Sequence, residues 1–267
     1  MKTIAVIGAG ALAKIFCTQT QKLLADNYRI VAVMARNPEH ANALAQTLDA
    51  DACTSIDELL SGFPDIVVEF AGRDAVKEYA LPVLEHGSDL IIASIGAMAD
   101  DEFRHNLTEY AQKNHRKVYL PNGAIGALDL MQTFALMGDV QIEIGNRKAP
   151  KSLEGAPYLK GKTLPVDREQ IVFTGSVQEA IDGFPKNVNV AVAAALAADS
   201  LNKATVQITS DPNTTENIHH IVLKNKLMRT ELTVAGRPDP ANPRSSTSTA
   251  WSVVALLKNL ASPVQFF

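Results

Sequence analysis

Residues 4–13 read IAVIGAGALA. The first four are apolar and predict a short buried strand, and apolar side chains then recur at helical spacing from Leu12 to Leu24. Between strand and helix lies a G-x-G-x-x-A turn. Such a turn binds the pyrophosphate of a dinucleotide, because its first glycine permits the tight bend and its second lets the backbone approach the phosphates. The residues expected to contact a cofactor here are Gly8, Gly10, Ala11 and Leu12.

Strand and helix patterns alternate over the first 121 residues. Further strands are expected at 30–34, 65–70, 90–94 and 117–120. Helices are expected at 37–48, near 59–60 behind a Ser55/Glu58 capping box, at 75–85 and at 101–115. This alternation predicts the α/β class, with an N-terminal Rossmann domain built on a doubly wound parallel sheet over residues 1–121. Two more cofactor contacts are expected directly after the strand at 65–70, at Ala71 and Gly72.

The pattern changes after Pro121. Strands are expected at 141–144, 171–174 and 205–209, followed by a hairpin at 218–223 and 230–234. Two apolar helices are expected around 124–137 and 188–201. We predict a second α+β domain with a largely antiparallel sheet over residues 122–245, serving substrate binding and dimerisation, and a terminal helix within 246–267 that packs back on the Rossmann domain.

The residue after the second strand bears on the choice between NAD and NADP. NAD enzymes commonly place an acidic residue there to bind the ribose 2′-hydroxyl, but this chain has Ala35 followed by Arg36. The Arg36 guanidinium could pair with a 2′-phosphate, which favours NADP. The alternative is an exposed arginine at a helix start with no ligand.

Composition excludes several classes of protein. A net charge of −4 provides no basic face for nucleic acid, and no apolar run reaches the length that spans a membrane. Cys17 and Cys53 form no C-x-x-C pair, so neither a disulfide framework nor a metal site is expected. The N-terminal apolar run is too short for a signal peptide. We therefore expect a cytoplasmic enzyme that acts on a small molecule.

Five short strings, taken in order, carry a family resemblance. They are SIGA at 94–97, GAIG at 123–126, FPKNVNV at 184–190, NIH at 217–219 and NPRSS at 242–246. Together they resemble the L-aspartate dehydrogenase family over nearly the whole chain. The resemblance implies oxidation of L-aspartate to iminoaspartate, which hydrolyses to oxaloacetate and ammonia or feeds NAD biosynthesis. It also implies that His219 is catalytic and that Ala124 and Asn189 contact the nicotinamide. The chain departs from the family pattern at Ala13 and Ala35.

The residues themselves leave the catalytic histidine less sharply defined. His219 and His220 are neighbours in an expected strand, so their side chains point to opposite faces and only one can readily enter a cleft. The resemblance selects His219, and the alternative is a hydrogen-bonded histidine on a sheet face. Asn187 and Asn189 are also plausible helix caps, and the resemblance favours a cofactor contact only for Asn189.

A dicarboxylate substrate needs cations near its carboxylates. The candidates are Arg147, Lys148, Lys186 and Arg244, with the Ser245 hydroxyl as an added donor. Ordinary solvated charge is the alternative for each. Two other functions stay open: a dehydrogenase or reductase resembling homoserine dehydrogenase or dihydrodipicolinate reductase, and a non-catalytic NAD(P) sensor. A homodimer is expected, because the helices of the second domain are too few to cover one face and an edge of its sheet, and because the resemblance implies association through this domain.

Overall fold

The structure is a computed structural model that describes residues 1–185, 188–239 and 242–266. The chain folds into two compact units. One comprises Met1–Pro121 together with Thr249–Phe267, and the other comprises Asn122–Ser248.

The first unit is built on a parallel sheet, to which the described residues contribute six strands. The strands are β1 (Lys2–Ile7), β2 (Tyr28–Met34), β3 (Asp51–Cys53), β4 (Ile66–Glu69), β5 (Asp89–Ile92) and β6 (Val118–Tyr119). Their order is β3-β2-β1-β4-β5-β6, and every pair is parallel. The order reverses between β1 and β4, which is where open α/β sheets bind ligands beyond the carboxyl ends of their strands. The predicted doubly wound parallel sheet is confirmed.

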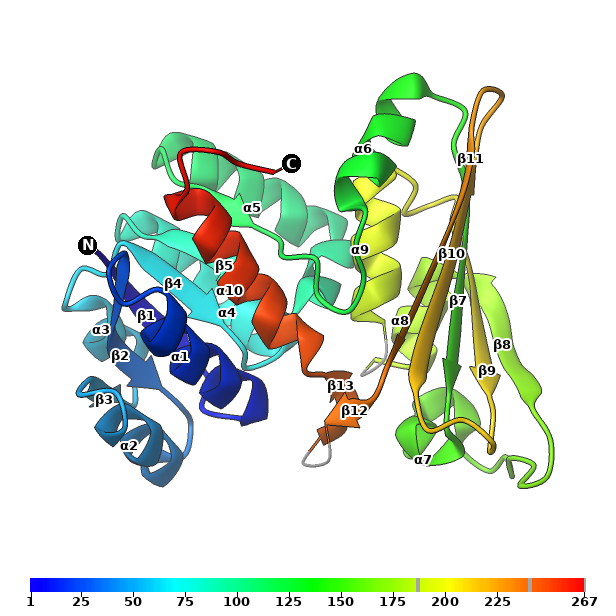
Figure 1. Cartoon of the computed structure of the whole chain (residues 1–267), viewed down its shortest axis with the longest axis horizontal. Helices are drawn as coiled ribbons and strands as arrows, with labels where there is room; N and C mark the ends of the chain where they lie inside the picture. Colours follow the sequence, from blue (N-terminus) through cyan, green and yellow to red (C-terminus); the bar gives the residue numbers. More distant parts are fainter. Residues whose placement is uncertain (186–187, 240–241, 267) are drawn as a thin grey trace. The chain divides into compact units, whose positions relative to one another are not determined.

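Helices follow the strands along this unit. They are α1 (Ala11–Leu23), α2 (Pro38–Gln46), α3 (Ile56–Leu60), α4 (Arg73–Glu85), the 3-10 helix η1 (Ile95–Ala99), α5 (Asp101–Lys113) and α10 (Ser248–Ala261). Local capping explains two of the starts: the Asn37 side chain accepts a hydrogen bond from the Glu39 N–H, and Asp100 accepts one from Phe103. Figure 1 shows α10 beside α1, although they come from opposite ends of the chain.

Packing explains why the last helix belongs to the first unit. Val253 and Leu257 of α10 are fully buried in one cluster with Phe16 of α1 and with residues of β1 and β2. The Tyr28 hydroxyl also donates a hydrogen bond to the Leu257 carbonyl at 3.0 Å. Burial of apolar surface contributes about 25 cal/mol of free energy per Å², and this contribution fixes the helix against the sheet.

The second unit contains a mixed sheet with the order β11-β10-β7-β9-β8. These strands are β7 (Gln141–Lys148), β8 (Gln170–Ser176), β9 (Thr205–Ser210), β10 (Asn217–Lys224) and β11 (Arg229–Gly236). All neighbours are antiparallel except β7 and β9, which are parallel. A two-stranded ribbon, β12 (Pro238–Asp239) with β13 (Asn242–Ser246), follows.

Helices cover one face of this sheet, which is called its inner face below. The main ones are α6 (Leu128–Met137), α8 (Val177–Gly183) and α9 (Asn189–Ala197), with the shorter α7 (Pro150–Leu153) and η2 (Pro157–Leu159). Figure 1 shows α6 and α9 together on the same side of the strands. Buried and exposed residues therefore alternate along β7, from Ile142 and Ile144 to Asn146 and Lys148 on the inner face.

The structure corrects several local expectations. Ala124 lies in a turn and not in a helix, because Gly123 (φ +64°) and Ala127 (φ +57°) adopt left-handed backbone and delay α6 to Leu128. The capping box before α3 is incomplete: Ser55 accepts from the Glu58 N–H, but the Glu58 carboxylate accepts from Thr54. The short strand β3 and the helix α8 were not expected.

Candidate functional site

The glycine turn after β1 is sterically enforced. Gly8 has φ +112°, and a Cβ there would lie 2.9 Å from both the carbonyl carbon and the oxygen of Phe70. Only glycine allows this approach between the ends of β1 and β4. At Gly10 a Cβ would meet no atom within 4 Å, so that glycine is not explained by contacts inside the chain.

The start of α1 is open to an anion. Gly10 is the N-cap residue and provides no side-chain cap, and the first turn, which includes Ala11 and Leu12, contains no acidic residue. Backbone N–H groups at such a helix start carry partial positive charge and point outward. The residues present therefore fit the pyrophosphate of a dinucleotide.

Glu69 organises the neighbouring turn at the end of β4. Its carboxylate accepts hydrogen bonds from the N–H groups of Ala71 (2.6 Å) and Gly72 (2.7 Å), and from the Ser94 N–H and hydroxyl. Burial raises the pKa of Glu69, and these hydrogen bonds oppose the rise. A carboxylate within the apolar run at 66–70 was the signal that could have identified this residue, because a buried acid requires donors.

Arg36 lies just beyond the carboxyl end of β2 and is exposed. Among the described residues it forms no ion pair, and its positive charge lowers the pKa of the Tyr79 phenol against the larger upward effect of burial. Ala35, before it, is half-buried. This end of β2 therefore has a cation and no carboxylate.

In the second unit, β10 separates the two adjacent histidines as expected. His219 is buried on the inner face, whereas His220 is exposed on the other face, where its Nδ1 lies 2.8 Å from the Thr233 hydroxyl. The His219 Nδ1 lies 2.6 Å from Oδ1 of Asn146, directly opposite on β7. Because an amide oxygen only accepts, Nδ1 carries the proton and Nε2 keeps its lone pair.

Burial holds His219 neutral. It lowers the pKa of His219 to about 3, and the positive charge of Lys148 adds to the effect. Lys148 itself is only 4% exposed, and burial lowers its pKa to about 8. No carboxylate in the described part of the chain pairs with its ammonium group. This is unusual, because buried lysines are almost always paired.

Two other buried groups, one on β7 and one on β9, have no hydrogen-bond partner among the described residues. They are Nδ2 of Asn146 and the hydroxyl of Ser210. A buried donor without an acceptor costs about 1–3 kcal/mol, so a folded chain retains few of them without a reason. Neither Asn146 nor Ser210 was expected from the sequence. The expected strand at 141–144 continues to Lys148, and the two-residue period over this longer strand places Asn146 and Lys148 on the same face as Ile142 and Ile144.

The remaining predicted residues are dispersed. Ala124 is half-buried in its turn, and Asn189 is the exposed first residue of α9, where Val188 holds the N-cap position. Arg147, one of the candidate substrate cations, lies on the outer face of β7, 2.9 Å from Glu169, which fits the alternative of an ordinary solvated charge. Lys186 and Asn187 lie outside the described residues. Arg244 and Ser245 belong to β13, and the positions of their side chains are likewise not described.

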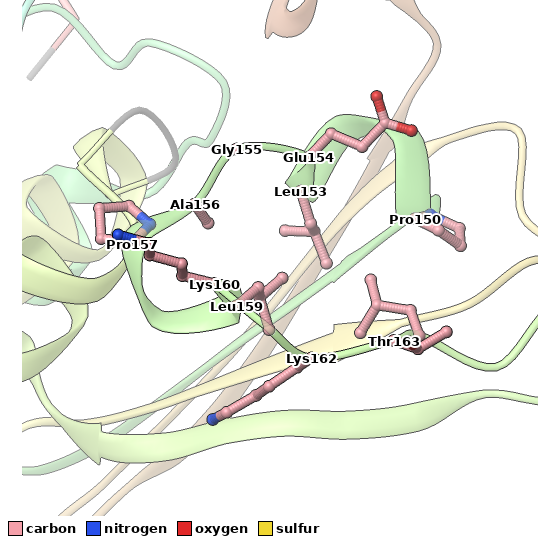
Figure 2. A pocket seen from close by; sticks show the side chains of 11 residues that line it. Pro150, Leu153, Glu154, Gly155, Ala156, Pro157, Leu159, Lys160, Lys162 and Thr163 are labelled. Atoms are coloured by element: carbon pink, nitrogen blue, oxygen red, sulfur yellow. The ribbon is translucent and has the colours of Figure 1, made fainter.

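A separate hollow of about 550 Å³ lies on the second unit. One continuous segment bounds it, from α7 through η2 to Leu164, and Figure 2 shows this segment around the hollow. The Lys162 ammonium sits over the Tyr158 ring, 3.7 Å from the centroid, and is therefore already engaged. None of the predicted site residues lines this hollow.

Comparisons with known proteins match both units. The model described as "Homoserine dehydrogenase, NAD binding domain" matches residues 7–121, and "Aspartate dehydrogenase, C-terminal" matches residues 129–260. The L-aspartate dehydrogenase of Methanococcus maripaludis is 36% identical over 269 residues, covering 99% of both chains. The chain belongs to the L-aspartate dehydrogenase family. Another relative, the L-aspartate dehydrogenase of Methanocaldococcus jannaschii, is 35% identical over 266 residues, with 99% of each chain covered.

Solved structures agree with this family. The aspartate dehydrogenase of Thermotoga maritima matches with a TM-score of 0.77 and 28% identity over 100% of both chains. A homoserine dehydrogenase from Thiobacillus denitrificans, at 15% identity and TM-score 0.64 over 97% of this chain and 73% of its own, shares the fold alone. Membership of the L-aspartate dehydrogenase family makes the chain an NAD(P)-binding oxidoreductase that acts on a small molecule.

Within the described residues, none of the helices has the length and apolar character needed to span a membrane. The same residues contain no group of three or more His, Cys, Asp and Glu side chains that could hold a metal ion.

Proposed function

We propose that the chain catalyses the reversible, NAD(P)-dependent oxidative deamination of L-aspartate. The Cα–H bond breaks and its hydride passes to the nicotinamide, which supplies the electron-accepting chemistry; loss of a proton from nitrogen leaves iminoaspartate. Water then gives oxaloacetate and ammonia. The observation that carries the proposal is a buried neutral imidazole, His219, beside a buried cation, Lys148, that pairs with no carboxylate among the described side chains; the two lie on adjacent strands of the second unit.

His219 acts as the general base for the water that attacks the imine, and as the acid in the reverse direction. Nε2 is the reacting atom, because Asn146 holds the proton on Nδ1 and fixes the plane of the ring. Asn146 is thus a positioning residue. A histidine with its pKa near 3 is in the base form throughout the neutral range before substrate binds.

The first unit holds the cofactor through backbone groups of two turns. The proposed contacts are Gly8, Gly10, Ala11, Leu12, Ala71 and Gly72, with Arg36 at the adenosine end. By family resemblance Ala124 and Asn189 contact the nicotinamide. Lys148 binds a substrate carboxylate, and Lys186, Arg244 and Ser245 are proposed as further substrate contacts on resemblance alone.

A steady-state assay tests the activity. Cofactor reduction is followed at 340 nm, an absorbance specific to the reduced nicotinamide, with L-aspartate and with homoserine; oxidation is followed with oxaloacetate plus ammonia. We expect turnover with L-aspartate and in the reverse mixture. Turnover with homoserine alone would overturn the proposal. Such an activity suits a cytoplasmic enzyme that feeds iminoaspartate to NAD biosynthesis.

Arg36 is expected to bias the cofactor pocket toward NADP(H). The paired change Ala35→Asp/Arg36→Ala supplies a ribose-binding carboxylate and removes the cation. The ratio of kcat/KM for NADP to that for NAD should fall about tenfold or more, the scale of one charged contact to phosphate. Measuring both constants in both proteins tests this, and an unchanged ratio removes Arg36 from the site.

A homodimer is proposed through the outer face of the second sheet. Figure 1 shows α6 and α9 on one side of that sheet. His220 and Thr233, on its other face, are exposed. Closed two-fold pairing is the commonest way to cover such a surface. Light scattering at micromolar concentration should give twice the 28.7 kDa chain mass. A monomeric mass would refute the pairing.

A further inference from the structure

Three groups that can donate hydrogen bonds lie on the inner face of the second sheet, and none of them has an acceptor among the described residues. Asn146 and Lys148 alternate on β7, and Ser210 stands directly opposite Lys148 on β9. Paired residues of neighbouring strands project to the same side of the sheet, so the Lys148 and Ser210 side chains share one surface. Nδ2 of Asn146 and the hydroxyl of Ser210 are both buried and unsatisfied.

Asp211, the buried acid nearest to these residues in sequence, does not pair with Lys148. Asp211 follows Ser210, but its carboxylate accepts from the Asn213 N–H at 2.9 Å and faces Arg147 at 3.5 Å. Lys148 is consequently a buried ammonium with no anion in the described part of the chain. An ammonium group, an amide NH2 and a hydroxyl can each donate a hydrogen bond, so together they match a carboxylate, which offers two oxygens and only accepts.

We propose that Asn146 Nδ2, Lys148 Nζ and Ser210 Oγ form a subsite for one carboxylate of a C4 dicarboxylate. This inference rests on the proposed function and deepens it, because it assigns Asn146 and Ser210 to substrate recognition beside Lys148. The charged contact comes from Lys148, and the two neutral donors fix the orientation of the carboxylate plane. Simple charge attraction at an exposed lysine could not supply that orientation.

Asn146 joins the subsite to the catalytic base. Its Oδ1 holds the His219 ring at 2.6 Å, so the same side chain that meets the carboxylate also orients the imidazole. A bound carboxylate also offsets the Lys148 charge. Because that charge helps to hold the pKa of His219 down, its compensation raises this pKa toward the range where proton transfer is efficient. Substrate binding thus prepares the base that acts on it.

Titration calorimetry of the full chain with succinate tests the subsite, because succinate is a C4 dicarboxylate that cannot be deaminated. The titration is done with saturating reduced cofactor. Lys148→Met should weaken binding by about tenfold or more, and Ser210→Ala by about threefold to tenfold. Lys148→Arg, which keeps the charge, should lose less than Lys148→Met. The matched control is Lys224→Met, which removes the same charge from the outer face of β10, where Lys224 pairs with Glu143.

The results separate this inference from the proposed activity. Succinate binding that depends on Lys148 and Ser210 supports the subsite even if L-aspartate is not turned over, in which case only the proposed activity fails. Turnover of L-aspartate by a wild-type chain that does not bind succinate overturns the subsite alone. Equal losses in Lys148→Met and Lys224→Met also overturn it, since they indicate unspecific charge attraction. Circular dichroism of each variant verifies the fold.

Discussion

The His219→Ala variant is expected to lose about a hundredfold or more in kcat for L-aspartate, the usual effect of removing a positioned acid or base. Its affinity for the dinucleotide should change little, because the proposed phosphate contacts are backbone groups of the first unit. Steady-state kinetics with saturating L-aspartate give kcat, and fluorescence titration gives cofactor affinity. Since alanine also leaves the Asn146 oxygen unpartnered, a urea denaturation curve is needed to separate lost chemistry from lost structure.

His220→Ala is the matched control for this experiment. It removes the same side chain one residue away, but from the outer face of β10, where His220 contacts Thr233. Most of the activity should remain. A near wild-type kcat in His219→Ala, or a loss confined to His220→Ala, would show that the base has been assigned to the wrong histidine.

The first unit was predictable almost element by element, for a physical reason. Its central parallel strands are buried on both faces, so they are apolar runs, and helices recognisable from the spacing of their apolar residues separate them. β3 escaped prediction because Asp51–Cys53 has no such run and is a strand only through its pairing with β2. The delayed start of α6 depends on left-handed backbone at Ala127, which residue type does not indicate.

The candidate site was less predictable, because it depends on strand pairing. The separation of His219 from His220 follows from the two-residue period of any strand. The contact between His219 and Asn146 requires the register of β10 against β7, over 73 positions of sequence separation. In the same way, Lys148 and Arg147 are equivalent as sequence candidates, and only the face of β7 separates a buried cation from one paired with Glu169.

Lys148→Met is expected to stabilise the fold. Burial lowers the pKa of Lys148 from 10.5 to about 8, so the folded state bears a cost of about 3 kcal/mol for keeping this ammonium charged at pH 7, at about 1.4 kcal/mol per pKa unit. Methionine fills a similar volume without charge. The free energy of unfolding of Lys148→Met, measured by urea denaturation, should exceed that of the wild type by about 2–3 kcal/mol at pH 7. The same substitution weakens binding in the proposed subsite, so stability and function change in opposite directions.

The pH dependence of the free energy of unfolding identifies why Lys148→Met is more stable than the wild type. Below pH 8 both states of the wild type carry a protonated Lys148, and the folded state bears the whole cost. Between about 8 and 10.5 the unfolded state binds more protons than the folded state, so the wild type gains stability from this group as the pH rises. The advantage of Lys148→Met should therefore be largest below pH 8 and shrink toward pH 10.5. An advantage independent of pH, or a variant less stable than the wild type at pH 7, would mean that the Lys148 ammonium is already compensated in the free protein, and the buried cation would then no longer argue for an anionic substrate.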